Sequence, residues 1–334
     1  MPLHVFKNVT LQSGVVMPEI AISYEIHGRL NVRRDNLVVF PTYFTGRQEC
    51  NRRYFGAGRA LDPGRYCILV PSLIGNSDSS SPSNTAGRFH GADFPHVTIH
   101  DNLRLQRALV DAVLPVEQVA LVIGWSMGGM QAYEWATQFP EFVQRLLPFC
   151  ATARCSTHNH VFLEGVKAAL TADGTWAGGR YEAPPERGLR AFGRAYAGWA
   201  YSDAFFNDGV YRTLGFESVE ELLADWERDH LGWDANDLLC KIRSWQQGDV
   251  SANDTYRRDI GRALGAIRAR TLVIPSSTDM YFTENHASRE AALVPGAEIR
   301  PFRTTLGHCG CTPGRPDPGF SPFLDHAIAD LMTR

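Results

Sequence analysis

Ser126 lies in the pentapeptide Gly-Trp-Ser-Met-Gly at residues 124–128, directly after a short apolar run at 119–123. The apolar run has the composition of a buried strand, and residues 131–137 continue with helical spacing. A serine on a tight turn from strand to helix adopts a strained backbone, so the positions two residues away on either side must be small. Gly124 and Gly128 meet that need, and the pattern predicts that Ser126 is a nucleophile.

The same turn predicts how charge that develops during a reaction would be stabilised. It places the Ser126 hydroxyl at a helix N-terminus, where the backbone N–H of Met127 faces a developing oxyanion. The alternative is a glycine-rich turn with a bystander serine. The strand before the turn and the helix after it favour the nucleophile.

A nucleophilic serine requires a base, and the base requires an acid that orients it. In a parallel sheet with this turn, the partners are expected later in the chain, in the order aspartate then histidine. Asp279 follows an apolar run at 271–274, and His308 lies one loop after another run at 297–302. His286 and His326 lie in helix-like stretches and are weaker candidates. The sequence therefore predicts a triad of Ser126, Asp279 and His308.

A second oxyanion donor is expected from the loop that follows the apolar run at 37–40. Phe44 is our candidate for that backbone N–H, and Tyr43 is the alternative. The loop could also do no more than shape the floor of the pocket.

The elements that must position these groups are short apolar runs bounded by turn residues. Several are nearly continuous in Val, Ile and Leu, as expected for strands buried on both faces of a parallel sheet. Helical patterns lie between them, including one that we expect Asp101 to cap. This alternation predicts an α/β fold with a mostly parallel central sheet. The predicted strands are residues 19–26, 37–40, 66–70, 119–123, 146–149, 271–274 and 297–302.

The alternation stops between about residues 155 and 266. This stretch is rich in Trp, Tyr, Gly and charged residues, and parts of it have helical periodicity. We expect one discontinuous core domain, residues 1–154 and 267–334, with a mostly helical lid inserted at 155–266. Because Ser126 precedes the insertion while Asp279 and His308 follow it, neither half could form the site alone.

Composition excludes several classes of function. The 334 residues are 44% apolar and 21% charged, with 33 Lys and Arg against 36 Asp and Glu, which argues against disorder and against binding of nucleic acid or anionic membranes. No secretory signal is evident at the N-terminus, and no run reaches the roughly 18 apolar residues of a membrane span. The 7 cysteines lack a disulfide-framework rhythm. We therefore expect a cytoplasmic protein with small-molecule partners.

No metal site is predicted. His96 and His100 have the spacing of a metal pair on a helix, but Pro95 and three β-branched residues favour a strand or loop there. Cys309 and Cys311 are too close together and too isolated for a zinc site.

With the serine turn and the triad in place, the chain resembles the homoserine O-acetyltransferase family of the α/β-hydrolase superfamily. The resemblance runs from about Tyr43 to His308. It includes an extended serine turn and a lid-helix segment that begins Asp-Ala-Asn-Asp. The segments that carry it are residues 58–62, 73–77, 81–83, 94–101, 125–136 and 234–239.

This resemblance implies an α/β-hydrolase fold and a ping-pong acyl transfer. The serine would take an acyl group from a donor, with acyl-CoA as a possible donor substrate, and an acceptor hydroxyl would replace water. No bound cofactor is implied. Members of the family are usually homodimers that pack through the lid.

Three positions depart from the family pattern. Cys309 follows the histidine where the family has an aspartate for the homoserine amino group, and Tyr201 lies where a lid arginine is expected. Arg194 is offset by about one position from an arginine that the family uses toward the substrate carboxylate. An unpaired buried charge costs several kcal/mol, so these changes disfavour an amino-acid acceptor. Our candidate substrate-binding residues are Tyr43, Trp125, Arg194, Tyr201 and Cys309.

The sequence therefore predicts a serine O-acyltransferase that acts on an acceptor other than homoserine. The alternative is an esterase or thioesterase that uses water as the acceptor. A more remote alternative is a non-catalytic binding protein on the same fold, against which the intact Ser126, Asp279 and His308 argue.

Overall fold

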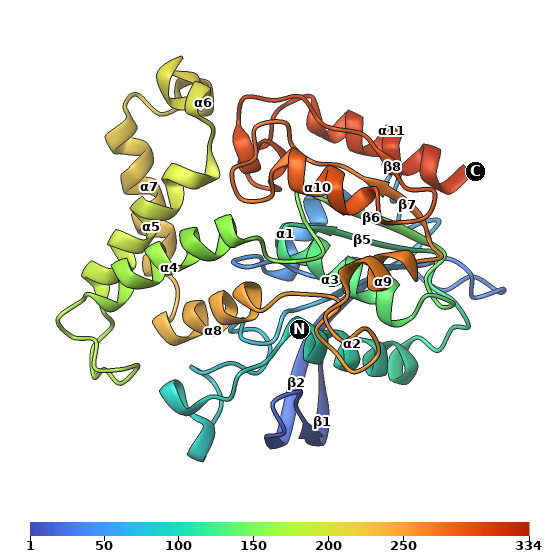
Figure 1. Cartoon of the computed structure of the whole chain (residues 1–334), viewed down its shortest axis with the longest axis horizontal. Helices are drawn as coiled ribbons and strands as arrows, with labels where there is room; N and C mark the ends of the chain where they lie inside the picture. The colour runs from blue at the N-terminus through green and yellow to red at the C-terminus, as the bar shows by residue number, and fades with distance from the viewer. Residues whose placement is uncertain (334) are drawn as a thin grey trace.

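The computed structural model describes residues 1–333 and contains an eight-stranded sheet in the order β1-β2-β4-β3-β5-β6-β7-β8 (Figure 1). The neighbours from β4 to β8 are parallel, whereas β2 runs antiparallel to both β4 and β1. The predicted α/β fold with a mostly parallel sheet is confirmed. The strands are β1 Leu3–Thr10, β2 Val16–His27, β3 Leu37–Val39, β4 Cys67–Pro71, β5 Leu121–Trp125, β6 Arg145–Phe149, β7 Arg270–Val273 and β8 Glu298–Ile299.

Each of the seven predicted runs overlaps a strand, but the sequence prediction missed β1. The central strands β3, β4 and β5 are buried at every residue, which explains their continuous apolar composition. β1 lies at the edge of the sheet, where Leu3 is 57% exposed and Val5 is 43% exposed. Because most of its residues face solvent, β1 has no buried apolar run to reveal it.

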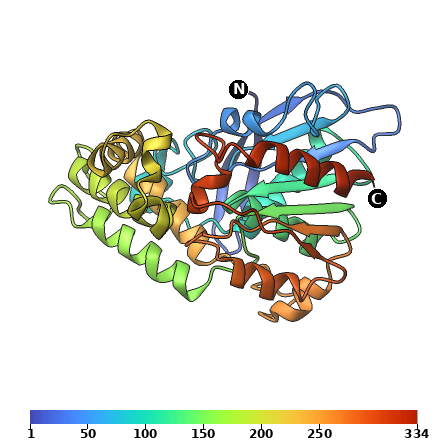
Figure 2. The same cartoon turned by 90° about the horizontal axis from the view of Figure 1, so that it is seen from above.

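Helices cover both faces of the sheet (Figure 2). One face packs against α11, and the other packs against α2, α3, α9 and α10. Successive strand residues point to opposite faces of the sheet. Val38 belongs to the apolar cluster that includes α11, and Val39 belongs to the cluster that includes α2, α3, α9 and α10. The helices are α1 Gln48–Asn51, α2 Ile99–Val113, α3 Met127–Gln138, α4 Thr157–Thr171, α5 Glu186–Ala200, α6 Asp203–Asn207, α7 Val219–Leu231, α8 Ala235–Gln246, α9 Ile260–Gly265, α10 Glu284–Ala291 and α11 Phe320–Thr333.

Helices α4 to α8, here called the lid helices, come between β6 and β7 and lie to one side of the sheet (Figure 1). The chain enters and leaves this group at one place, because Arg154 and Asp249 form an antiparallel bridge and their side chains form a 3.0 Å ion pair. Within the range that the sequence assigned to the lid, α9 packs on the core instead, in the same apolar cluster as α3. No helix among residues 1–333 is long and apolar enough to cross a bilayer.

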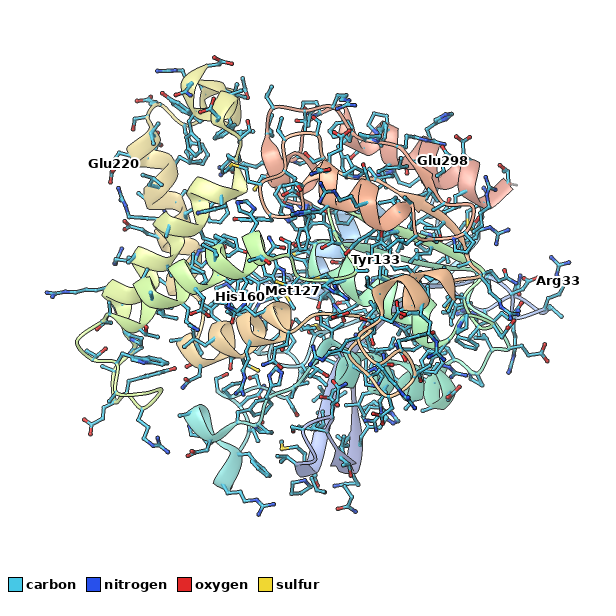
Figure 3. All side chains as sticks on the ribbon, in the orientation of Figure 1. Arg33, Met127, Tyr133, His160, Glu220 and Glu298 are labelled. Carbon is cyan, nitrogen blue, oxygen red and sulfur yellow. The ribbon has the colours of Figure 1, made fainter. Side chains whose placement is uncertain are left out.

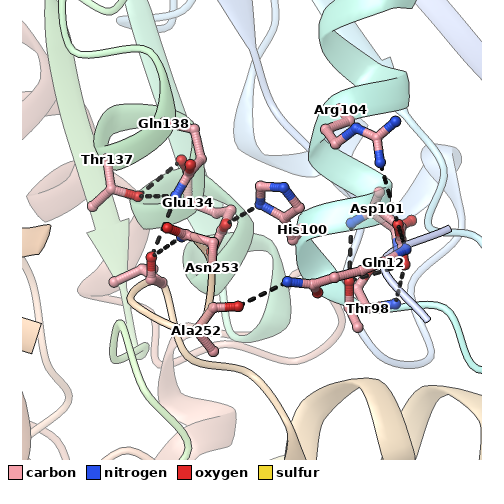
Figure 4. Close-up of polar contacts among 12 residues, drawn as sticks. Gln12, Thr98, His100, Asp101, Arg104, Glu134, Thr137, Gln138, Ala252 and Asn253 are labelled. Carbon is pink, nitrogen blue, oxygen red and sulfur yellow. Dashed lines mark hydrogen bonds and ion pairs between the residues drawn. The ribbon is translucent and has the colours of Figure 1, made fainter. Parts of the chain in front are cut away.

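The start of α2 is a hydrogen-bonded junction that corrects two sequence expectations (Figure 4). Thr98, not Asp101, is the N-cap residue, and Asp101 completes a capping box by accepting from the Thr98 backbone N–H. His100 lies within the first turn of α2, where the sequence had suggested a strand or loop, and its Nδ1 pairs with Glu134 Oε1 at 2.9 Å. Gln12 joins the junction to the segment after the lid helices through the Ala252 carbonyl.

Candidate active site

Ser126 occupies the turn between β5 and α3 with φ 56° and ψ −128°, a strained conformation for a residue with a side chain. A Cβ at Gly124 would lie 2.1 Å from the Gly128 carbonyl oxygen, and a Cβ at Gly128 would lie 2.7 Å from the Pro41 carbonyl oxygen. Both positions must therefore be glycine for the turn to close. The strain and the tight packing together hold the Ser126 side chain at the end of β5.

His308 and Asp279 meet beside this turn. His308 lies in a 3₁₀ segment, Gly307–Cys311, and its Nδ1 is 2.6 Å from Asp279 Oδ2. The other oxygen of Asp279 accepts hydrogen bonds from the backbone N–H groups of Tyr281 at 2.7 Å and Phe282 at 3.0 Å. These donors fix the carboxylate, which in turn fixes the orientation of the imidazole.

Aromatic rings enclose the His308 imidazole. Trp125 stacks on it with centroids 4.8 Å apart and planes at 23°, and Tyr281 meets it edge-on at 4.9 Å. Ser126 and His308 line the same pocket. Within the described residues the Ser126 hydroxyl makes no hydrogen bond. A proton transfer between Ser126 and His308 is therefore a proposal and not an observed contact.

The pocket has a volume of about 420 Å³ and lies between the sheet and the lid helices. Its floor comes from the loop after β3, the serine turn and the loop around His308. Its roof comes from α5 and α7. The residues that line it are Tyr43, Phe44, Thr45, Cys50, Arg53, Trp125, Ser126, Tyr196, Ala200, Tyr201, Asp225, Trp226, Asp229, His230, Tyr281, His308, Cys309, Thr312, Pro313, Gly314 and Arg315.

The structure brings four of the five predicted substrate-binding residues to this pocket, namely Tyr43, Trp125, Tyr201 and Cys309. The two residues predicted to supply oxyanion donors are also close to the site. Phe44 lines the pocket, and Met127 is the first residue of α3, directly after Ser126.

Arg194 is the exception, and its predicted role in substrate binding needs correction. Its guanidinium donates to Glu220 Oε1 and Glu227 Oε1, each at 2.8 Å, and these carboxylates raise its pKa. Glu220 lies on the outer part of α7, well away from Met127 (Figure 3). Arg194 does not line the pocket, and its charge is already paired with two carboxylates of α7.

The wall next to His308 is uncharged. Burial raises the pKa of the Cys309 thiol to about 12, and it also raises the pKa of the Tyr201 and Tyr196 hydroxyls. Charged groups occur at the mouth instead, where Arg315 Nη1 lies 3.6 Å from Asp225 Oδ2. The pocket therefore offers an apolar, neutral interior behind a charged rim.

The sequence prediction missed several pocket residues, including Tyr196, Trp226 and Tyr281. Tyr281 follows Asp279 by two positions, so its proximity to the site could have been predicted from the triad. The aromatic content of the insertion was a signal for the other two. It did not show which rings turn toward the pocket and which pack within the lid.

One group of potential metal ligands overlaps the site. Donor atoms of Cys150, Asp279 and His308 lie within 4.8 Å of one another, and all three residues are buried. Thiolate, carboxylate and imidazole are common zinc ligands. However, burial raises the pKa of the Cys150 thiol, which keeps it protonated, and His308 Nδ1 already pairs with Asp279. These residues fit a histidine–aspartate pair better than a metal centre.

Comparison with known proteins agrees with this geometry. A family model described as the alpha/beta hydrolase fold matches residues 36–304. This chain belongs to the α/β hydrolase family.

Two similar proteins and one similar solved structure give more detail than the family match. This α/β hydrolase is 38% identical to an ethyl acetate hydrolase of Pseudomonas veronii over 327 residues, which covers 97% of this chain and 93% of the relative. It is 31% identical to a homoserine O-acetyltransferase of Chlorobium chlorochromatii over 315 residues, covering 88% and 86% of the two chains. The solved structure of the acetyl esterase MekB matches with a TM-score of 0.95 and 36% identity, covering 100% of this chain and 97% of the other.

The resemblance to homoserine O-acetyltransferases is thus confirmed, but the identity to the two esterases is higher. This α/β hydrolase is an enzyme of a superfamily that includes both esterases and acyltransferases.

Proposed function

We propose that this α/β hydrolase is a serine esterase that hydrolyses acetyl esters of small, uncharged alcohols. The observation that carries the proposal is the neutral wall beside His308, formed by Cys309 and Tyr201. The names of the relatives support it, since the ethyl acetate hydrolase and the acetyl esterase share more identity with this chain than the homoserine enzyme does. The esterase alternative is therefore preferred to the acyltransferase that the sequence favoured.

In the first half of the proposed reaction, the Ser126 oxygen attacks the carbonyl carbon of the ester while His308 Nε2 takes the hydroxyl proton. Asp279 at Nδ1 stabilises the imidazolium that forms. The negative charge on the carbonyl oxygen is met by the backbone N–H groups of Met127 and Phe44. Collapse of this intermediate breaks the ester C–O bond, and the alcohol leaves with the proton from His308.

In the second half, a water molecule gives its proton to His308 and its oxygen attacks the acetyl carbon on Ser126. The same two N–H groups stabilise the second oxyanion, and collapse releases acetate as the serine recovers its proton. Acetate and alcohol are the only products, and the reaction uses no cofactor.

The distribution of charge supports an acceptor other than an amino acid. A bound homoserine would bring an ammonium and a carboxylate into a pocket whose charged lining residues, Arg53, Asp225, Asp229 and Arg315, are exposed or half-exposed and do not form the wall beside His308. Leaving either charge unpaired would cost several kcal/mol. Arg194, the one predicted partner for a carboxylate, is held by Glu220 and Glu227 outside the pocket.

The test measures hydrolysis and transfer in one assay. Purified protein is incubated with ethyl acetate, and acetate release is followed with and without L-homoserine or a simple alcohol. The intact mass of the protein reports the acetyl group on Ser126. We expect acetate release that homoserine does not divert, and no acetyl adduct with Ser126→Ala. Acetylation of homoserine from acetyl-CoA at a rate above that of ester hydrolysis would overturn the proposal in favour of the acyltransferase.

A cytoplasmic location is also proposed, on the state of the thiols. All seven cysteines are free, and the two in the loop around His308, Cys309 and Cys311, are buried close to the site. A reducing compartment would keep them in this state. Cell fractionation of the source organism tests this, and recovery in a secreted fraction would contradict it.

A further inference from the structure

Lys241 on α8 is a fully buried cation that the proposed chemistry does not use. Its side chain has no exposed surface, and its ammonium makes no hydrogen bond to any described residue. Burying an unpaired charge is costly. A lysine held at such a position requires an explanation from its surroundings.

The ammonium of Lys241 lies over aromatic faces. Its Nζ is 4.0 Å from the centroid of the Trp233 ring and 5.3 Å from that of the Phe44 ring. Attraction between a cation and a ring face is strongest where water is excluded, as it is here. Lys241 therefore contacts, from the lid side, the residue whose backbone N–H is our second oxyanion donor.

Phe44 is otherwise held by rings and not by polar contacts. It stacks on Tyr196 of α5, with centroids 5.7 Å apart and planes at 5°, and it tilts against Trp245 of α8 at 6.0 Å. The loop that carries it is fixed at its far end, where Asn76 Nδ2 donates to the Gly46 carbonyl at 2.7 Å. The position of the Phe44 side chain is therefore set by the lid helices, and Phe44 also lines the pocket.

The titratable and charged groups around Lys241 come from four parts of the chain. Arg47 and Asp78, an ion pair at 3.2 Å, face it from the loops after β3 and β4. Asp237 and Cys240 face it from α8 itself, and His230 of α7 also interacts with its charge. Asp78 Oδ2 is buried with no hydrogen-bond partner. The other oxygen of Asp78, Oδ1, pairs with Arg47, and Asp237 accepts two hydrogen bonds from Ser83.

We propose that Lys241 is a positioning residue that couples the seating of the lid to the oxyanion hole by holding the Phe44 ring through its positive charge. This inference rests on the proposed function, because it assigns Phe44 to the oxyanion hole. The charge acts on a single loop, so its loss is expected to reduce the turnover number kcat more than it changes KM. This positioning role differs from a packing role, because in a packing role an apolar side chain of the same length would replace Lys241 without loss of activity.

The ionisation of Lys241 gives this coupling a pH signature. Burial lowers the pKa of Lys241 to about 8, and repulsion from Arg47 acts in the same direction, while Asp237 and Asp78 oppose it. The ammonium is therefore charged below about pH 8 and neutral above it. If the charge positions Phe44, kcat of the wild-type enzyme falls as pH rises through this range, and the fall is absent when Lys241 is replaced by methionine.

The charge of Lys241 is expected to support kcat but to lower the stability of the fold. A lysine in the unfolded chain stays charged up to about pH 10, so the lowered pKa in the folded state means that burying the charge destabilises the fold at pH 7. Lys241→Met should therefore raise the melting temperature or leave it unchanged. A residue that served only structure would lower it on removal.

The experiment compares wild type, Lys241→Met, Lys241→Arg, Phe44→Leu and the Lys241→Met/Phe44→Leu double variant. Hydrolysis of p-nitrophenyl acetate gives kcat and KM from pH 6 to 10, and thermal melts give stability. We expect each single neutral variant to lose about tenfold in kcat with less than threefold change in KM. We expect the double variant to lose no more than either single one, because both act through one ring.

The matched control is Arg107→Met. Arg107 lies 3.9 Å from the centroid of the Phe142 ring, and neither residue lines the active-site pocket. Its kcat should equal that of wild type. An unchanged kcat in Lys241→Met, or multiplied losses in the double variant, would overturn the proposal. If Lys241→Met does not fold, the pH profile of the wild type and the activity of Lys241→Arg decide the question, and a flat profile above pH 8 would count against the proposal.

A second readout separates this inference from the esterase proposal. The organophosphate paraoxon phosphorylates an active serine with its phosphoryl oxygen in the oxyanion hole, and intact mass reports the rate on Ser126. If wild type reacts with paraoxon but hydrolyses no carboxylic ester, the esterase proposal fails while this rate still tests Lys241. About tenfold slower phosphorylation in Lys241→Met supports the coupling, and an equal rate overturns it. No reaction in wild type overturns both proposals.

Discussion

Trp125 stacks on His308, with ring centroids 4.8 Å apart and planes at 23°. The residue directly before Ser126 therefore sets the plane of the His308 imidazole. Trp125 is also the last residue of β5, so the sheet fixes its place. Tyr43 meets the same indole edge-on at 4.5 Å. The loop after β3, the serine turn and the histidine are thus packed against one another through a single tryptophan.

Replacing Trp125 tests whether this stack orients the base. Trp125→Ala removes the surface against which His308 lies, so we expect kcat/KM for p-nitrophenyl acetate to fall about tenfold or more, since small misplacements of catalytic groups are costly. Trp125→Phe keeps part of the stack, so its fall in log kcat/KM should be less than half of the fall in Trp125→Ala. Trp176→Phe, in a ring pair with Tyr181 outside the pocket, is the control. Full activity in Trp125→Ala would show that the stack is not needed.

Asp279→Asn tests the acid of the proposed triad. The amide oxygen can still accept from the backbone N–H groups of Tyr281 and Phe282, which leaves the NH₂ group facing His308 Nδ1. The imidazole is then forced into the wrong tautomer, and kcat should fall by about 10³ to 10⁴. Steady-state kinetics with a titration of active serines measures this. A loss of less than tenfold would indicate that Asp279 does not orient the base.

The sequence alone was sufficient to predict seven of the eight strands of the sheet, all but β1, and the residues at its carboxyl edge. The signals there are local: buried strands are continuous in apolar residues, and the serine turn requires glycine at positions 124 and 128. The order of serine, aspartate and histidine along the chain then selected Asp279 and His308. Their hydrogen bond could be predicted because both follow strands of one parallel sheet.

The parts that could not be predicted depend on contacts between distant elements. Arg194 had the right charge and nearly the right place in the chain, yet two glutamates of α7 hold it outside the pocket. The direction of an aromatic side chain in the lid, such as Trp226, depends on how α5 packs against α7. Asp101 was expected to cap α2 because it is a good capping residue, but the N-cap is Thr98, three residues earlier, and Asp101 lies inside the first turn.

Arg194→Gln tests the corrected view of that residue. Because Arg194 pairs with Glu220 and Glu227 away from the pocket, kcat and KM should stay within twofold of wild type. Because these ion pairs are partly exposed and screened by solvent, their loss should change the stability little. Steady-state kinetics and urea unfolding check the two expectations. A rise in KM of tenfold or more would return Arg194 to the substrate site.

Glu290 makes the stability of the lid junction depend on pH. This residue of α10 accepts hydrogen bonds from the backbone N–H groups of Ala153 at 2.6 Å and Arg154 at 3.1 Å, where the chain leaves the core for the lid helices. Burial raises the pKa of Glu290 to about 7, and the two N–H donors only partly offset this. A glutamate in the unfolded chain titrates near pH 4.3.

Between these two pKa values the folded protein binds more protons than the unfolded chain, so the contribution of Glu290 to stability is largest at low pH and is lost as pH rises to about 7. Glu290→Gln carries no such charge. We therefore expect the free energy of unfolding of wild type, measured relative to this variant by urea titration, to fall by on the order of 1 kcal/mol from pH 5 to 8. Glu284→Gln on the same helix controls for the substitution. Parallel stability curves for wild type and Glu290→Gln would show that the Glu290 carboxyl titrates alike in both states, and the junction would then be insensitive to pH.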